Sequence, residues 1–231
     1  MKKFVAVLLT MVLMLCAANA LAAGKLIVTQ ENYHTVSSLW TYGHAYVKVE
    51  NTGDKPIKVN AGVLEIYDEN GDVITSTDWL SAYARILQPG EYTYASLQAE
   101  IEDGSNVPVD YAITITGKSD QAVTTMRLPC TASLELDVEE DWWTYNYMYA
   151  EVTNHTDAPL YDISVVLALL DAEGNILYMD DDSLYSEKAL APGSTLFFRK
   201  DISSEFMDYF AANNLVPASV DAIAYVEIEN E

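Results

Sequence analysis

The chain has 231 residues, and its 35 acidic side chains outnumber the 12 basic ones, which gives a formal net charge of −23 at pH 7. A surface with this charge repels phosphate backbones and anionic lipid, because nucleic-acid binding depends on lysine and arginine, so nucleic acid is excluded as a partner. Half of the residues are apolar, which is enough for the cores of one or two domains.

The N-terminus has the pattern of a secretory signal peptide over residues 1–22. A basic start (Met1–Lys3) precedes the apolar run Phe4–Cys16, and Ala20–Ala22 form a small-residue cleavage signature. We expect cleavage after the last of these alanines, which removes two lysines and makes the net charge −25. Since no later run of about eighteen apolar residues exists, we predict a secreted or extracytoplasmic protein with no membrane span after cleavage.

Cleavage leaves Cys130 as the single cysteine, because Cys16 lies in the signal peptide. Leu15 stands where a lipoprotein signal has a small residue, so a lipid anchor is disfavoured. An internal disulfide is impossible, although export would permit one, and the fold must therefore depend on its hydrophobic core.

The rest of the chain consists of two similar halves at a fixed offset of 103 residues, and the match needs no gap from Trp40 to Gly90. Solenoid repeats are far shorter, so each unit of about a hundred residues is expected to form its own β-sandwich. We predict domains at 23–120 and 133–231, joined by a linker at 121–132. The matching residues include Trp40, Tyr46, Val49, Asn51, Leu64, Asp68, Gly71, Leu87, Pro89 and Gly90 with Trp143, Tyr149, Val152, Asn154, Leu167, Asp171, Gly174, Leu190, Pro192 and Gly193.

Each half contains a predicted β-hairpin, at Leu64–Ile74 and at Leu167–Leu177. An apolar strand leads to a D-x-x-G turn and then to a second apolar strand. The turn glycine, Gly71 or Gly174, is expected at positive φ, where a Cβ atom costs energy.

The remaining local signals follow the same order in both halves. Segments 75–86 and 178–189 are polar and expected to be irregular, and Pro-Gly turns of type II follow within 87–91 and 190–194. The C-terminal half then inserts about six more residues. Apolar groups at helical spacing over Ser203–Phe210 predict one short helix there, with the serine as its N-cap.

A strand around residue 46 is predicted to have one buried and one solvated face, because apolar and polar residues alternate along it. The buried set is Ala45, Val47 and Val49, and the solvated set is His44, Tyr46 and Lys48.

At the hairpin and the Pro-Gly turn the sequence resembles the FxLYD family of extracytoplasmic bacterial domains. The resemblance rests on Leu64-x-Ile66-Tyr67-Asp68 followed by Gly71, and on Leu87-x-Pro89-Gly90-Glu91. The second half departs from the pattern, because Leu170 replaces the tyrosine and Ser194 the glutamate. The resemblance implies an all-β chain of two tandem immunoglobulin-like β-sandwich domains on a secreted or surface protein, and it implies no catalytic residues.

Residues for catalysis or metal binding form no recognisable pattern. His34, His44 and His155 are the only histidines, none has metal-ligand spacing, and we expect all three on the surface. Acidic residues are too abundant to single out a pair for glycoside hydrolysis. The run Asp180–Asp182 could offer oxygen ligands to calcium, but the first half does not repeat it.

Sixteen tyrosines and four tryptophans are the sharper signal, because an exposed ring can stack on a sugar or anchor a protein partner. Trp142 and Trp143 are neighbours, so one of them is expected to face inward. The match with Trp40 places Trp143 in the core, whereas alternation along the preceding strand points Trp142 inward, and both interpretations stay open. Trp79 lies unmatched in a polar loop, and we take Trp79 and Trp142 as the candidate ligand contacts.

We therefore predict a secreted or cell-surface, non-catalytic binding or scaffold protein with no cofactor and no metal site. Its expected partner is an unidentified protein or glycan at the cell surface. Two alternatives stay open, namely a glycan-cleaving enzyme that uses carboxylates on a sheet face and a calcium-dependent adhesive module.

Overall fold

The computed structural model describes residues 24–82, 84–102, 104, 106–119, 123–184 and 189–229. The predicted signal peptide at 1–22 lies outside these residues. The regular secondary structure of the described chain is almost entirely β-strand in antiparallel sheets, with one helix, which confirms the all-β prediction. In this part of the chain no helix is both long and apolar enough to cross a membrane.

The N-terminal half forms two antiparallel sheets, which we call sheet A and sheet B. Sheet A has the strand order β1-β2-β7-β5, and in sheet B strand β3 pairs with β4, β6 and β8. The strands are β1 (Leu26–Ser37), β2 (Thr41–Asn51), β3 (Ile57–Tyr67), β4 (Val73–Thr77), β5 (Leu80–Ala82), β6 (Ile86–Leu87), β7 (Tyr92–Ile101) and β8 (Asp110–Lys118).

The C-terminal half forms sheet C, with the order β13-β12-β15-β9, and sheet D, with the order β10-β11-β14. Strand β9 lies inside the predicted linker at 121–132 and pairs with β15, so most of that segment is strand. The domain boundaries themselves stay a prediction. The elements are β9 (Val123–Leu128), β10 (Cys130–Glu140), β11 (Trp143–Thr153), β12 (Ile163–Leu170), β13 (Ile176–Leu184), β14 (Thr195–Asp201), α2 (Ser204–Ala212) and β15 (Ser219–Glu229).

The strand register repeats at the offset seen in the sequence. Leu64 lies opposite Thr77 in the first hairpin, and Leu167 lies opposite Asp180 in the second. Strands β2 and β7 pair in the same register as β11 and β14. Both leucines are fully buried, so the two hairpins occupy corresponding places in the two halves.

The hairpin turns have the predicted geometry. Asp68 Oδ1 accepts hydrogen bonds from the backbone N–H groups of the second and fourth residues after it, and Asp171 Oδ1 does the same in the second half. Gly71 and Gly174 have φ angles of +83° and +85°. An aspartate that bonds its own turn and a glycine in the left-handed region together fix the hairpin.

A buried asparagine, at the end of β2 or directly after β11, bonds the backbone at the start of each Pro-Gly turn. Asn51 and Asn154 are fully buried, and their side-chain amides donate to the carbonyls of Leu87 (2.9 Å) and Leu190 (2.8 Å). Each asparagine also bonds the turn that directly follows its strand. Satisfied polar groups of this kind specify a unique arrangement, because leaving them unpaired in the interior is costly.

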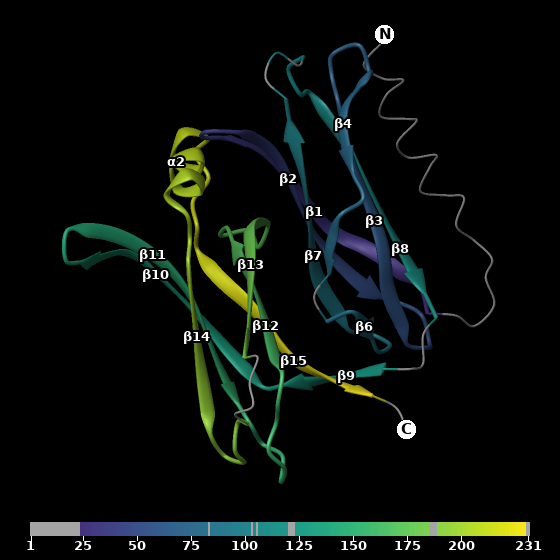
Figure 1. Ribbon diagram of the computed structural model, residues 1–231, viewed down its shortest axis with the longest axis vertical. Helices are drawn as coiled ribbons and strands as arrows, with labels where there is room; N and C mark the ends of the chain where they lie inside the picture. The colour runs from purple at the N-terminus through teal and green to yellow at the C-terminus, as the bar shows by residue number, and fades with distance from the viewer. Residues whose placement is uncertain are drawn as a thin grey trace.

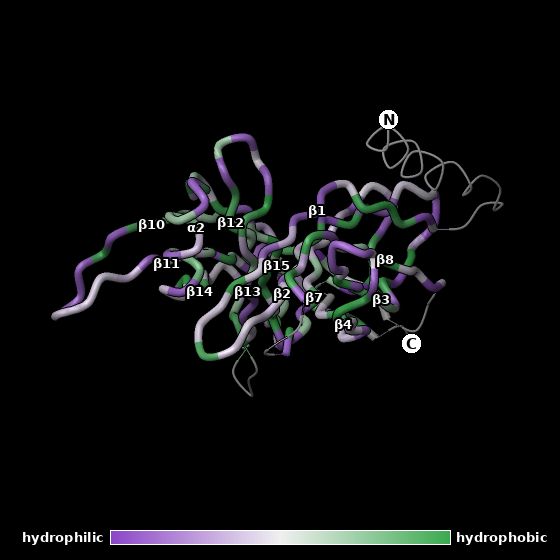
Figure 2. Tube along the Cα trace, turned by 90° about the horizontal axis from the view of Figure 1, so that it is seen from above, coloured by the Kyte–Doolittle hydropathy of each residue, from purple (hydrophilic) through white to green (hydrophobic). Residues whose placement is uncertain are grey.

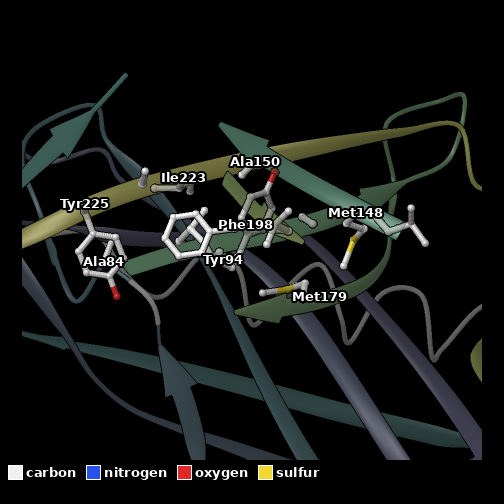
Figure 3. Close-up of a cluster of buried hydrophobic side chains, with 14 of the residues drawn as sticks. Ala84, Tyr94, Met148, Ala150, Met179, Phe198, Ile223 and Tyr225 are labelled. Atoms are coloured by element: carbon white, nitrogen blue, oxygen red, sulfur yellow. The ribbon is translucent and has the colours of Figure 1, made fainter. Parts of the chain in front are cut away.

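The four sheets stack in the order B, A, C and D, so sheets A and C face each other in the middle of the molecule (Figure 1, Figure 2). One buried cluster crosses this junction and contains Ala84 and Tyr94 of the N-terminal half together with Ile223 and Tyr225 of sheet C (Figure 3). The two halves are therefore packed tightly against each other.

Polar contacts also join the halves. The hydroxyl groups of Tyr92 and Tyr94 both donate to Asp221 Oδ2, at 2.8 and 2.6 Å. Alternate side chains of β1 donate to backbone carbonyls of the β12–β13 hairpin, which are more than 140 residues away in the sequence. These pairs are Gln30 with Gly174, Asn32 with Ile176 and His34 with Leu177.

The stacking explains why the two central strands differ. In β3, Leu64 and Ile66 are buried while Val63 is exposed, as expected for a strand with one solvated face. In β12, every residue from Val165 to Leu169 is buried, because one face covers sheet D and the other faces sheet A. Because both faces of β12 are buried, its sequence is a nearly continuous apolar run and not an alternation of polar and apolar residues.

The prediction that one face of β2 is solvated is wrong. That face packs towards sheet C, where Tyr46 is only 3% exposed and His44 is half-buried. His34 on β1 is buried as well, so only His155 lies on the surface as expected. Alternation along one strand shows that its two faces differ, but it does not show what covers the second face.

Two further expectations for local structure need correction. Within 75–86, β4 continues to Thr77 and the chain then crosses to sheet A as β5, and within 178–189 β13 continues to Leu184. Helix α2 is confirmed at the predicted position, although Ser203 makes no side-chain cap hydrogen bond. Its buried Phe206 ring contacts the ring of His44 at 4.9 Å, so the helix packs against sheet A.

Candidate functional site

All four tryptophans of the chain lie at turns and are exposed. Trp40, Trp79, Trp142 and Trp143 have exposed fractions of 61%, 78%, 95% and 71%. Tryptophan is highly buried on average in folded proteins, and exposed aromatic groups mark contact surfaces. These indoles are therefore the first candidates for ligand contact.

The structure overturns both interpretations of the Trp142–Trp143 pair, because neither ring faces inward. Glu140 at the end of β10 pairs with Trp143 at the start of β11, and Asp141 and Trp142 form the turn between them. The alternation of buried and exposed residues applies only where a second sheet covers the strand. At this turn no other sheet does so.

Strands β10 and β11 extend beyond the rest of sheet D as a two-stranded projection (Figure 1, Figure 2). Strand β14 pairs with β11 only from Tyr147 to Thr153, so within the described chain no third strand pairs with residues 136–146. We call residues 136–146 the arm. A register shift between Glu135 and Val138 separates the arm from the body of the sheet.

A cluster of polar and aromatic groups links the arm to the body of sheet D. Glu140 pairs with Arg199 Nη1 at 3.2 Å and accepts a hydrogen bond from the Tyr147 hydroxyl at 3.2 Å. The Arg199 guanidinium lies over the Tyr147 ring, 4.5 Å from its centroid. Desolvation, and then the hydrogen bond to Glu140, raise the pKa of Tyr147. These contacts connect the arm to β14.

The arm carries one sign of charge. Its four ionisable carboxylates are Asp137, Glu139, Glu140 and Asp141, and it contains no lysine or arginine. Among the residues that the structure describes, only Glu140 of these four pairs with a cation. The tip therefore combines two exposed indoles with carboxylates that stand in solvent.

Trp79 lies apart from the arm. It follows β4 by two residues in the N-terminal half, whereas the arm projects from the opposite end of the stack (Figure 1). The two candidate ligand contacts, Trp79 and Trp142, are therefore exposed but do not form one surface. The sequence left open whether Trp143 is exposed, and it did not single out Trp40 as an exposed residue. The acidic run before Trp142 was the available signal, because three consecutive acids cannot enter a core.

Other reactive groups are occupied by structural contacts. Asp180 forms an ion pair with Lys200 at 3.3 Å, and burial raises the pKa of this carboxyl group. The half-buried Cys130 thiol lies 3.2 Å from the carbonyl of Ala222, and burial raises its pKa, which disfavours the reactive thiolate. Over the described residues, no group of three His, Cys, Asp or Glu side chains could hold a metal ion.

Comparisons with models of protein families and with curated proteins return no match for this chain. The resemblance to FxLYD domains therefore stays a prediction that rests on the hairpin and turn residues.

Proposed function

We propose that the protein is a non-catalytic binding protein of the extracytoplasmic space and that the tip of the arm is its contact surface. The observation that carries the proposal is Trp142, which is 95% exposed at the end of a two-stranded projection. Trp143 beside it is also exposed. Large rigid aromatic side chains supply contact area at a low entropic cost, which is why they dominate binding surfaces.

The contacts between the arm and the rest of sheet D support this proposal. Glu140 pairs with Arg199 and accepts a hydrogen bond from Tyr147, and the Arg199 guanidinium lies over the Tyr147 ring. A binding element that is held in place before contact loses less conformational entropy on binding. The arm would thus present its indoles in a defined direction.

Export and domain organisation belong to the same proposal. A signal peptide at 1–22 would deliver the chain out of the cytoplasm, and two FxLYD-like, immunoglobulin-like domains would form the body that carries the arm. The repeated strand register and the paired buried asparagines support a duplication of one sandwich unit.

The test is a binding assay with the mature chain, residues 23–231, on immobilised cell-surface polysaccharides and proteins. Binding should shift the tryptophan emission to shorter wavelength, because a solvated indole becomes desolvated. Trp142→Ala with Trp143→Ala should abolish binding, while Trp79→Ala, a matched change of an exposed tryptophan outside the arm, should retain it. Equal binding by the arm variant and the unchanged protein would refute the proposal.

A further inference from the structure

We infer that the arm recognises a cationic partner, namely a lysine- or arginine-rich segment of another protein. This inference rests on the proposed function and adds the chemistry of the partner to it. The observation behind it is that two exposed indoles and a group of carboxylates lie at one end of the same hairpin.

The charges of the arm are available to a partner. Asp137, Glu139 and Asp141 are exposed, and no lysine or arginine of the described chain pairs with them. From Cys130 to Thr153 the hairpin contains six carboxylates and no basic residue. Charges of one sign on a projecting element attract the opposite sign and raise the rate of encounter.

The tryptophans fit the same partner. The face of an indole ring is the best side-chain site for an ammonium or guanidinium group. Trp142 and Trp143 stand beside Asp141, so a basic side chain at the tip could contact a ring face and a carboxylate together. An arginine-rich or lysine-rich segment can make both contacts repeatedly along its length.

The other possible occupants fit less well. A neutral glycan could stack on the indoles but would gain nothing from the carboxylates. Anionic lipid and a second arm would both bring like charges together. The turn that carries Trp40 is a useful contrast, because no charged residue occurs from Val36 to Val47. The arm combines two exposed indoles with four carboxylates, whereas the other exposed tryptophan, Trp79, has a single acidic neighbour in Asp78.

Fluorescence titration with a short oligo-lysine peptide tests the inference, with a neutral glucan oligosaccharide and anionic phospholipid vesicles as parallel probes. Oligo-lysine should bind at low salt, and its affinity should fall as salt rises. Trp142→Ala with Trp143→Ala should weaken it by about tenfold or more. Glu139→Gln with Asp141→Asn should weaken it by about tenfold and flatten the salt dependence.

A matched charge control separates the arm from the overall negative surface. Glu69→Gln with Asp72→Asn removes the same two charges from the exposed β3–β4 turn and should leave the affinity within about twofold. If this control weakens oligo-lysine binding as much as the arm variant does, only bulk charge is involved and the inference is wrong. Absence of oligo-lysine binding at low salt, or binding to anionic vesicles, also overturns it.

The titration with the neutral glucan oligosaccharide distinguishes the two proposals. If the tryptophan variants lose glucan binding while oligo-lysine binding is unaffected, the cationic partner is wrong but the arm remains a binding surface. If no probe depends on Trp142 and Trp143, both proposals fail. Circular dichroism of each variant confirms that the fold is retained, since all the changed side chains are exposed.

Discussion

Two histidines at the junction of sheets A and C should make folding stability depend on pH. His34 is 3% exposed, lies 2.9 Å through Nε2 from the carbonyl of Leu177, and contacts the Tyr209 ring at 5.1 Å. His44 contacts the Phe206 ring at 4.9 Å. The pKa of both imidazoles is lowered to about 4, chiefly by burial, and for His44 the charge of the neighbouring His34 contributes to the same shift.

The direction follows from proton binding. An unfolded chain protonates its histidines near pH 6.5, whereas the folded protein does so only near pH 4, so acid favours the unfolded state between these values. The contribution is complete above about pH 6.5, falls as the pH drops and is fully lost below about pH 4. At about pH 5 the loss is about 2 kcal/mol for each histidine. That is a large part of a typical unfolding free energy of about 5–15 kcal/mol.

Urea unfolding at about pH 7.5 and about pH 5 measures this loss. Carboxylates also change stability with pH, so the comparison is between the unchanged protein and a His34→Gln, His44→Gln variant. The unchanged protein should lose about 2–4 kcal/mol more between the two pH values, because glutamine does not titrate. If the double variant shows the pH dependence of the unchanged protein, the two imidazoles are not held neutral by burial.

Three further outcomes are expected. Asn51→Ala and Asn154→Ala should each lower the unfolding free energy by about 2–4 kcal/mol, because buried carbonyls lose their donors, while the exposed Asn175→Ala should cost under about 1 kcal/mol in the same urea titration. Gly90→Ala and Gly193→Ala should each lower the unfolding free energy by about 1 kcal/mol or more, measured by thermal unfolding. The added Cβ meets no atom within 4 Å, so the positive φ angles of +80° and +73° are the sole cause. A neutral effect would contradict this explanation. Trp142→Ala should change the unfolding free energy by less than about 0.5 kcal/mol, because its ring is solvated, and a larger loss would show that the ring packs in the native state.

The local geometry of the fold was predictable because it is encoded within short stretches. Gly71 and Gly174 follow their aspartates by three residues, and a turn of this kind needs nothing from the rest of the chain. The type II turns at Gly90 and Gly193 are likewise confirmed, with positive φ and a hydrogen bond across each turn. The offset of 103 residues then carried the same geometry from one half to the other.

The contacts between halves could not be predicted in this way. Tyr46 is buried by sheet C, which lies more than a hundred residues away in the sequence, so its own strand gives no sign of that cover. The repeat also misled, since the match of Trp143 with Trp40 indicated a shared core position and both rings are exposed. The match correctly identified equivalent positions in the two halves, but it did not indicate whether those positions are buried.

The order of the four sheets decides which sheet faces meet solvent. Sheets A and C are each covered on both faces, whereas the outer face of sheet B exposes Ala61 and Val63 and carries the half-buried Glu65, whose carboxylate accepts a hydrogen bond from the hydroxyl of Tyr67. The outer face of sheet D exposes Glu151. Phe197 of β14 lies opposite Glu151 and is 66% exposed, so this face also carries an apolar ring. The two ends of the stack therefore mix polar and apolar side chains, whereas β12 in the middle is buried on both of its faces.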